Sequence, residues 1–172
     1  MAARNSLDLD TDPREIVGTR EFDAPRDLVW QAWTDPKHLA QWWGPTGFTT
    51  TTKNFDMRAG GMWRFVMHGP DGRDYQNRIT FDEIVKGERI AYRHAGGEDV
   101  EPVQFRTLVT FEDLDGRRTR ITWRATFPSA AERARVIKEY GADKGLVQTM
   151  ARLADYVVAL AAHAESQQRI TR

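Results

Sequence analysis

The four histidines, His38, His68, His94 and His163, are the side chains best suited to acid–base chemistry or metal binding in this sequence. An unperturbed imidazole titrates at about pH 6.5, so a histidine can serve as a general base near neutral pH. No two of them stand at the spacings typical of metal ligands. The chain also has no cysteine, which removes thiolate nucleophiles and cysteine-based metal sites. We therefore expect no metal and no other cofactor.

The composition narrows the classes of partner. Lys plus Arg and Asp plus Glu each total 25 in 172 residues, so no basic excess indicates nucleic acid or an anionic membrane. The start, MAARNSLDLDTDPRE, has no apolar stretch able to act as a signal peptide, and no segment approaches the roughly 20 apolar residues of a membrane span. The sequence predicts a soluble, cytoplasmic protein without a nucleic-acid or membrane partner.

The middle of the chain, from about residue 48 to 127, predicts an antiparallel sheet. Short runs of alternating polarity are separated by turn sequences such as AGG at 59 and GPDG at 69. In the run at 48–57 the alternation favours neither set of residues, so no inner face is predicted for this strand. For the other runs, the alternation predicts these inward-facing residues: Trp63, Phe65, Met67, Tyr75, Asn77, Ile79, Phe81, Ile90, Tyr92, His94, Val103, Phe105, Thr107, Val109, Phe111, Thr119, Ile121, Trp123, Ala125 and Phe127.

Four polar residues belong to this otherwise apolar set: Asn77, His94, Thr107 and Thr119. A buried polar group without a partner costs about 1–3 kcal/mol, so each of them must meet a protein group, a water or a ligand. One explanation is that His94 and Thr119 lie near strand ends and reach solvent. The other is that Asn77 and His94, with nearby tyrosine hydroxyls, orient a mostly apolar ligand.

Two short helices are predicted after a strand at residues 15–22. The first covers residues 25–33, and its proline stands at a position that the first turn of a helix tolerates. The second covers residues 34–43, and either Thr34 or Asp35 can cap its free amides. We expect these helices to close one end of the sheet.

The adjacent tryptophans Trp42 and Trp43 end the second helix, where Leu39 shares their face and Gly44 and Pro45 stop the helix. Neighbouring residues on a helix lie about 100° apart, so only one of the two indoles is expected to point squarely into the core. We expect mainly a structural role for the pair, with Trp43 nearer the rim of a cavity.

From Ser129 onward the pattern becomes helical. Ser129 can cap a helix at 130–140, Gly141 breaks it, and a second helix at 143–164 carries a regular apolar stripe. About 20 helical residues span roughly 30 Å, enough to cross the sheet. The stripe consists of Leu146, Met150, Leu153, Val157 and Leu160.

The order of elements predicts an α+β fold in which a strongly curved antiparallel sheet wraps around the long C-terminal helix. We expect one domain at 14–164, with flexible tails at 1–13 and 165–172. A curved sheet and a straight helix do not fill all the space between them, so such a domain can keep a ligand cavity.

Four segments of the chain together carry a family resemblance: REFDAPRDLVWQAWTDPKHLAQWWGPTGF, DMRAGGMWRFVMHGPDGRDY, VTFEDLDGRRTRITWRATF and DKGLVQTMARLADYV. With these segments the sequence resembles the bacterial homologues of the activator of Hsp90 ATPase, in the START-like (SRPBCC, polyketide cyclase and Bet v 1-type) superfamily. The resemblance implies the helix-grip fold, with an internal cavity that often binds hydrophobic ligands. The chain departs from the family at one position, because the family often has tryptophan where this chain has Leu146.

We predict the ligand-binding residues from the inward faces, the helix stripe and the tryptophan pair. About two thirds of the inward aromatic residues are expected only to pack the core, and His94 is the one candidate for a catalytic base. The predicted ligand-binding set is Trp43, Trp63, Phe65, Met67, Tyr75, Asn77, Ile79, Tyr92, His94, Phe105, Leu146, Met150 and Leu153.

Three functions fit these observations. The favoured one is binding of a hydrophobic or aromatic small molecule in the cavity. The first alternative is an enzyme of the cyclase or dehydratase type, which needs a polar pair within hydrogen-bond reach inside the cavity. The second is a co-chaperone-like module that binds an Hsp90 homologue; the eukaryotic co-chaperone has a second domain not found in this sequence, which lowers this expectation. A homodimer is also expected.

Overall fold

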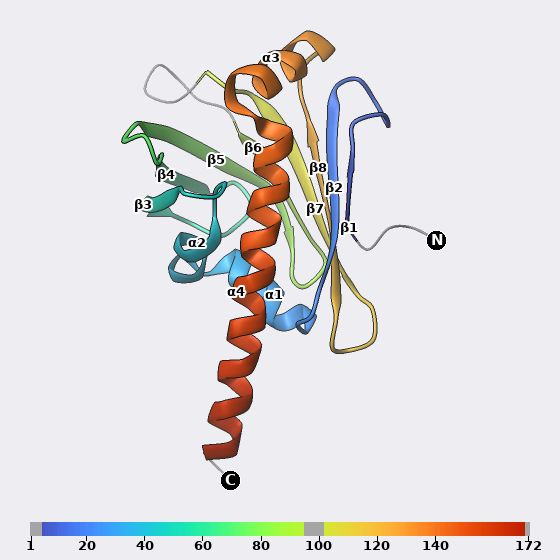
Figure 1. The fold of residues 1–172 in the computed structure, drawn as a ribbon, viewed down its shortest axis with the longest axis vertical. Helices are drawn as coiled ribbons and strands as arrows, with labels where there is room; N and C mark the ends of the chain where they lie inside the picture. The colour runs from blue at the N-terminus through green and yellow to red at the C-terminus, as the bar shows by residue number, and fades with distance from the viewer. Residues whose placement is uncertain (1–4, 95–101, 171–172) are drawn as a thin grey trace.

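The computed structural model describes residues 5–94 and 102–170 (Figure 1). In this part of the chain, eight strands form one antiparallel sheet that is accompanied by four helices. The strands are β1 (Asn5–Asp8), β2 (Glu15–Phe22), β3 (Thr49–Phe55), β4 (Met62–His68), β5 (Asp74–Val85), β6 (Arg89–His94), β7 (Phe105–Asp113) and β8 (Thr119–Thr126). The helices are α1 (Arg26–Thr34), α2 (Pro36–Trp42), α3 (Ala130–Tyr140) and α4 (Ala142–Ile170).

The sheet has the strand order β1-β2-β8-β7-β6-β5-β4-β3 and curves around α4 (Figure 1). Helices α1 and α2 lie together beside the middle of α4, whereas α3 lies at its N-terminal end. This is the helix-grip arrangement that the sequence predicts. Helix α4 has 29 residues, so it is about 44 Å long and exceeds the predicted segment by several residues.

Both predicted tails contain regular secondary structure in the part of the chain that the structure describes. Residues 5–8 form β1, which pairs with β2 from Asn5 opposite Arg20 to Asp8 opposite Val17. Residues 165–170 continue α4, with exposed side chains. A four-residue edge strand has no strong local pattern, and it forms because its partner β2 offers free backbone groups.

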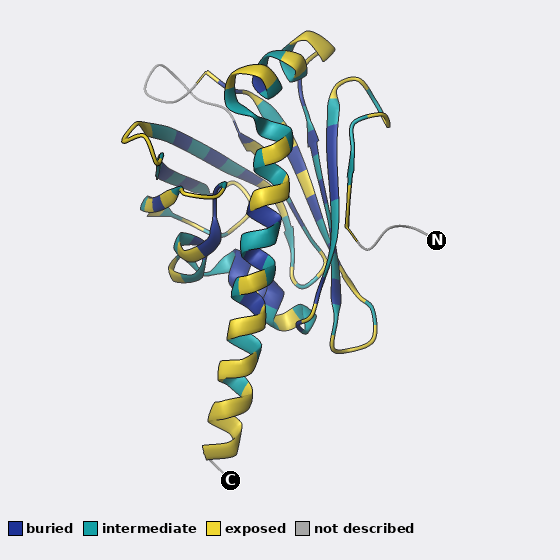
Figure 2. Ribbon diagram, viewed as in Figure 1, coloured by how far each residue is buried: buried dark blue, intermediate teal, exposed yellow. Residues whose placement is uncertain are grey.

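The predicted strand faces are confirmed, because the residues assigned to the inner face are buried or half-buried wherever they are described (Figure 2). Strand β3, for which the sequence favoured neither face, is an edge strand with a register shift between Thr52 and Asn54. Such a bulge changes which face the following side chains meet, and it therefore breaks the two-residue alternation. Only Thr50 of this strand is buried.

The helix ends have the predicted chemistry. Asp35 is the residue that caps α2, since its carboxylate accepts from the Lys37 amide at 2.9 Å. Ser129 caps α3 by accepting from the Glu132 amide at 3.1 Å, and Gly141 ends α3 in the left-handed conformation. Of the three residues, Gly141 directly precedes α4 and so sets the direction in which the chain enters that helix.

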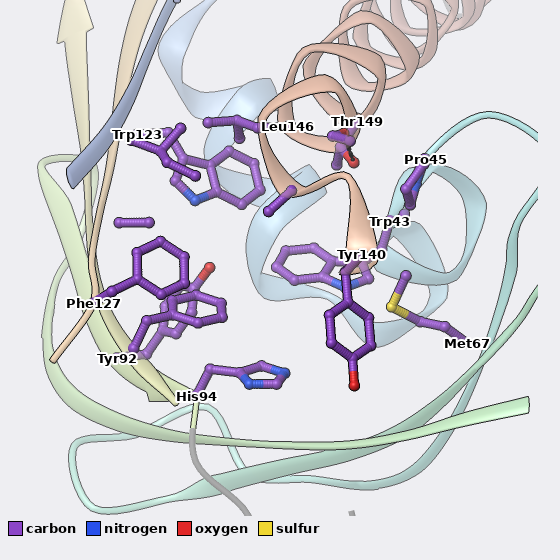
Figure 3. Close-up of a pocket in the computed structure, with 16 residues that line it drawn as sticks. Trp43, Pro45, Met67, Tyr92, His94, Trp123, Phe127, Tyr140, Leu146 and Thr149 are labelled. Atoms are coloured by element: carbon purple, nitrogen blue, oxygen red, sulfur yellow. Dashed lines mark hydrogen bonds between the residues drawn. The ribbon is translucent and has the colours of Figure 1, made fainter. Parts of the chain in front are cut away.

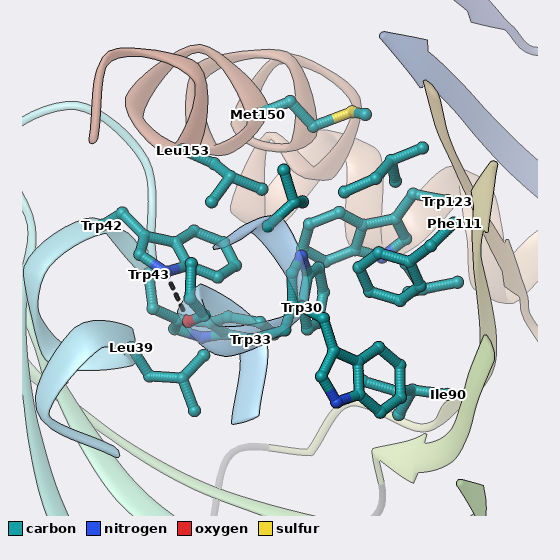
Figure 4. Packing of buried hydrophobic residues seen from close by; sticks show 14 of the residues in the cluster. Trp30, Trp33, Leu39, Trp42, Trp43, Ile90, Phe111, Trp123, Met150 and Leu153 are labelled. Carbon is teal, nitrogen blue, oxygen red and sulfur yellow. Dashed lines mark hydrogen bonds between the residues drawn. The ribbon is translucent and has the colours of Figure 1, made fainter. Parts of the chain in front are cut away.

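A cluster of tryptophans fills the space between α1, α2 and the sheet (Figure 4). The ring of Trp33 lies 5.1 Å from that of Trp42, 5.5 Å from that of Trp43 and 4.7 Å from that of Trp123. The Trp42 indole N–H donates to the Ala32 carbonyl at 3.0 Å. Most of the buried aromatic side chains therefore pack in the core, at the place where α1 and α2 lie beside α4.

Both Trp42 and Trp43 are buried, so the prediction that only one of them points into the core is wrong. The 100° offset applies only within a helix, and α2 ends at Trp42. Trp43 is the C-cap residue with extended backbone (φ −65°, ψ 129°), which turns its side chain inward as well. The backbone then changes direction at Gly44, whose φ is +106°.

Candidate functional site

A cavity of about 200 Å³ lies under the first two turns of α4 (Figure 3). Its walls come from the turn after α2, from strands β2, β4, β6, β7 and β8, and from the junction of α3 with α4. We call it the first lobe. It is lined by Ile16, Trp43, Gly44, Pro45, Met67, Tyr92, His94, Phe105, Trp123, Ala125, Phe127, Tyr140, Ala142, Gly145, Leu146 and Thr149.

A second lobe of about 240 Å³ adjoins the first and is lined by Phe48, Tyr75, Asn77, Val103, Val136 and Glu139 together with residues that line both lobes. Each lobe alone is smaller than the roughly 300 Å³ at which pockets for drug-sized ligands begin, so one lobe suits one or two aromatic rings. The residues that line both lobes are Pro45, Met67, His94, Phe105, Tyr140 and Ala142.

The lining of the cavity is almost uncharged. None of the described residues around the first lobe is charged, and Glu139 is the one ionisable carboxylate among those described around the second. An ion without a partner is costly to bury, so the first lobe favours neutral molecules. Burial also raises the pKa of the Tyr92 hydroxyl above its usual range, which keeps this group neutral as well.

His94 and Asn77 form a hydrogen-bonded pair on the inner face of the sheet. The two side chains are buried, and His94 Nε2 lies 2.8 Å from Asn77 Oδ1. Phe105 stacks on the imidazole, with ring centres 4.8 Å apart and an angle of 5° between the rings. The sequence predicts that each of these buried polar side chains must meet a partner, and in the structure each has the other. The alternative in which His94 reaches solvent is wrong, as it is for Thr119, whose buried hydroxyl donates to the Ala24 carbonyl.

Burial lowers the pKa of His94 to about 4, against a smaller opposing effect of the Val103 carbonyl. In the unfolded chain this pKa is about 6.5. Between these values the unfolded state binds more protons than the folded state, so stability falls as the pH falls. We expect His94 to make the protein about 2 kcal/mol less stable at pH 5 than at pH 7.

This pH dependence is measured by urea unfolding of the wild type and of His94→Gln at both pH values. The variant lacks the titrating group, so its loss of stability between pH 7 and pH 5 is expected to be smaller by that amount. His163→Gln, at an exposed histidine of α4, is the matched control. Equal losses in the wild type and in His94→Gln would contradict a depressed pKa.

The turn that follows α2 is fastened to α4 by two side chains one helical turn apart. Arg152 Nη1 donates to the carbonyls of Gly44 at 2.9 Å and Pro45 at 3.1 Å, and the Gln148 amide oxygen accepts from the Thr46 amide at 3.1 Å. Burial lowers the pKa of Arg152. A cation at the free carbonyls of a helix end is favourable, and here it also holds one wall of the cavity.

The predicted site residues divide into two groups. Trp43, Met67, Tyr92, His94, Phe105 and Leu146 line the first lobe, and Tyr75 and Asn77 line the second. Their role in ligand binding stays a prediction. Five others line neither lobe, because they pack in the core cluster: Trp63, Phe65, Ile79, Met150 and Leu153.

Several lining residues were not predicted as site residues. Pro45 lies in the turn after α2 and Tyr140 is the last residue of α3, and the fold brings both to the cavity (Figure 3). Gly145 and Thr149 flank Leu146 on the cavity side of α4. The helical spacing around Leu146 is the signal that could have identified these last two.

The other described histidines lie away from the cavity lining. His68 bridges the Thr51 hydroxyl at 2.8 Å and the Asp74 carboxylate at 2.7 Å, on the exposed side of β3, β4 and β5. His38 lies 2.5 Å from the Tyr156 hydroxyl. Among the described residues, no group of three or more His, Asp or Glu side chains is placed to hold a metal ion.

Within the described residues, no helix has the length and apolar character needed to span a membrane. The model of the family of Activator of Hsp90 ATPase homolog 1-like proteins matches residues 23–158. Comparison with curated protein sequences gave no match.

Solved structures share this fold over most of the chain. A protein from Arthrobacter aurescens, solved by NMR in solution, is 26% identical with a TM-score of 0.82 over 91% of this chain and 93% of its own. Protein Ms6760 from Mycobacterium smegmatis is 28% identical with a TM-score of 0.75 over 90% and 94%.

DynU16, from the dynemicin biosynthetic locus, is 22% identical with a TM-score of 0.59, over 84% of this chain and 47% of its own. At this identity the likeness is one of fold alone. The family match carries further, since it covers well over half of the chain and includes α1, α2, the sheet from β3 to β8 and most of α4. The protein therefore belongs to the family of Activator of Hsp90 ATPase homolog 1-like proteins.

Proposed function

We propose that this protein binds a neutral, mostly apolar small molecule, aromatic in character, in the two-lobed cavity under α4. The observation that carries the proposal is the lining itself. Aromatic and aliphatic side chains surround both lobes, and few polar groups, chiefly His94, Asn77 and Tyr92, interrupt them. A concave apolar surface with a small number of polar groups is the usual form of a small-molecule site.

The family and the START-like fold support this proposal, because both are compatible with the binding of a ligand between the sheet and the long helix. The fastening of the turn at Gly44 and Pro45 by Arg152 also supports it. A wall held by charge-assisted hydrogen bonds keeps its shape without a ligand, which reduces the entropy cost of binding.

The enzymatic alternative has weaker support. His94 Nε2 is engaged by Asn77, and a pKa of about 4 makes the imidazole a poor base at neutral pH. The co-chaperone alternative also has little support, since the exposed large apolar side chains among the described residues are scattered. They are Leu108 on β7 and Val147, Val158 and Ile170 on α4.

Ligand-observed NMR with naphthalene tests the proposal. Two fused apolar rings match the size of one lobe, and saturation of the protein methyl groups is expected to transfer to the bound compound. An excess of a second neutral aromatic compound should displace it. The proposal would be overturned if neither naphthalene nor its neutral derivatives gave a saturable signal.

A further inference from the structure

The hydrogen bonds of Asn77 determine which ring nitrogen of His94 carries the proton. Asn77 Nδ2 lies 2.9 Å from the Tyr75 carbonyl oxygen, and only the amide NH₂ can donate to a carbonyl. The amide oxygen of Asn77 therefore faces His94 Nε2 at 2.8 Å, where it can only accept. The proton of the neutral imidazole must accordingly be on Nε2.

This assignment leaves His94 Nδ1 as a hydrogen-bond acceptor. The nearest polar atom recorded for Nδ1 is the Val103 carbonyl oxygen at 3.4 Å, and that oxygen is an acceptor too. Two acceptors at this distance cannot bond to each other. Protonation of the ring would remove the conflict, but burial opposes it.

Both residues border the ligand cavity. His94 lines both lobes, and Val103 lines the second. Figure 3 shows the imidazole on the same side of the cavity as Tyr140. Among the residues that the structure describes, no donor faces His94 Nδ1. Because a buried acceptor without a donor is costly, this position favours a ligand that brings an O–H or N–H group.

We infer that the ligand is a neutral aromatic molecule carrying a hydrogen-bond donor, and that this donor binds between His94 Nδ1 and the Val103 carbonyl oxygen. The inference rests on the proposed function, because it specifies the ligand of the same cavity. A carboxylate at this place would face two acceptors and bring no donor of its own. The site therefore selects against anions.

Four naphthalene compounds separate these features: 2-naphthol has a donor, 2-methoxynaphthalene only an acceptor, naphthalene neither, and 2-naphthoate a negative charge. We expect 2-naphthol to bind about fivefold to tenfold more tightly than naphthalene, as one well-placed hydrogen bond allows. 2-Methoxynaphthalene should gain nothing over naphthalene, and 2-naphthoate should bind most weakly.

The double variant His94→Phe/Asn77→Leu removes both polar side chains together, so that neither is left without its partner. It is expected to lose the preference for 2-naphthol while still binding naphthalene. Thr34→Val is the matched control, because the Thr34 hydroxyl donates to the Trp30 carbonyl of its own helix at 2.9 Å and Thr34 lines neither lobe. That variant should keep the preference.

The wild-type protein provides a readout that does not depend on a variant. In ¹⁵N NMR spectra of the histidine side chains, the Nδ1 signal of His94 should shift towards the hydrogen-bonded range with 2-naphthol and not with naphthalene. Equal affinity for 2-naphthol and naphthalene, or an unshifted Nδ1 signal, would overturn the inference and leave the proposed function intact. Absence of binding by all four compounds would overturn the proposed function itself.

Discussion

Replacement of Leu146 by tryptophan is expected to weaken binding of naphthalene at least tenfold. Leu146 lines the first lobe from α4, and its side chain packs against Gly18 of β2. A larger side chain at this position is expected to extend into the cavity that Leu146 lines.

The matched control is Val158→Trp, which introduces the same side chain at a position of α4 that is 47% exposed. This variant should bind naphthalene as the wild type does. Urea unfolding should give Leu146→Trp a stability within about 1 kcal/mol of the wild type, because the new atoms occupy existing space. A Leu146→Trp protein that is folded and binds naphthalene normally would place the ligand outside the first lobe.

Replacement of Trp42 by alanine is expected to lower the free energy of unfolding by about 3–5 kcal/mol. Trp42 is fully buried, and its ring contacts those of Trp33 and Trp43. The substitution removes these contacts and also leaves the Ala32 carbonyl without its indole donor. Such a loss is a large part of the total stability of a domain of this size.

Trp42→Phe separates packing from the hydrogen bond. It keeps an aromatic ring in the cluster and removes the N–H donor, so it should cost clearly less than Trp42→Ala. Chemical unfolding of both variants measures the two losses. A cost below about 1 kcal/mol for Trp42→Ala would contradict the role of this residue as a central anchor of the core.

The sequence predicts the inner and outer faces of this sheet well. In β8, Thr119, Ile121, Trp123 and Ala125 alternate with outward residues, and each of them is buried. The alternation follows from the geometry of a single strand, so it needs no knowledge of the strand's neighbours. The helix caps at Asp35, Ser129 and Gly141 are local in the same sense.

The alternation identifies the inner face of a strand, but it does not show which part of that face borders the cavity. Trp63 and Phe65 share the inner face with Met67, yet only Met67 lines the cavity. The difference arises because the end of α2 brings Trp43 against the other part of that face, where its ring lies 4.8 Å from that of Trp63 and 5.9 Å from that of Phe65. The packing of this helix end is tertiary information that the strand sequence does not contain.

Tertiary packing also explains why only part of the apolar stripe of α4 lines the cavity. Leu146 lines the cavity, whereas Met150 and Leu153 on the same stripe pack into the core cluster with the tryptophans. Tyr140 was missed because it ends a helix whose position depends on the turn at Gly141. Helical spacing identifies the buried side of a helix, but the partners across from it decide where space remains.

The most direct test of the account is to locate a bound neutral aromatic compound by NMR. Intermolecular NOEs are measured between 2-naphthol and the methyl groups of the protein. We predict NOEs to the methyl groups of Ile16, Met67 and Leu146, which surround the first lobe. NOEs confined to exposed methyl groups such as those of Val147 or Val158, or no NOEs under saturating ligand, would contradict the claim that this cavity is the binding site.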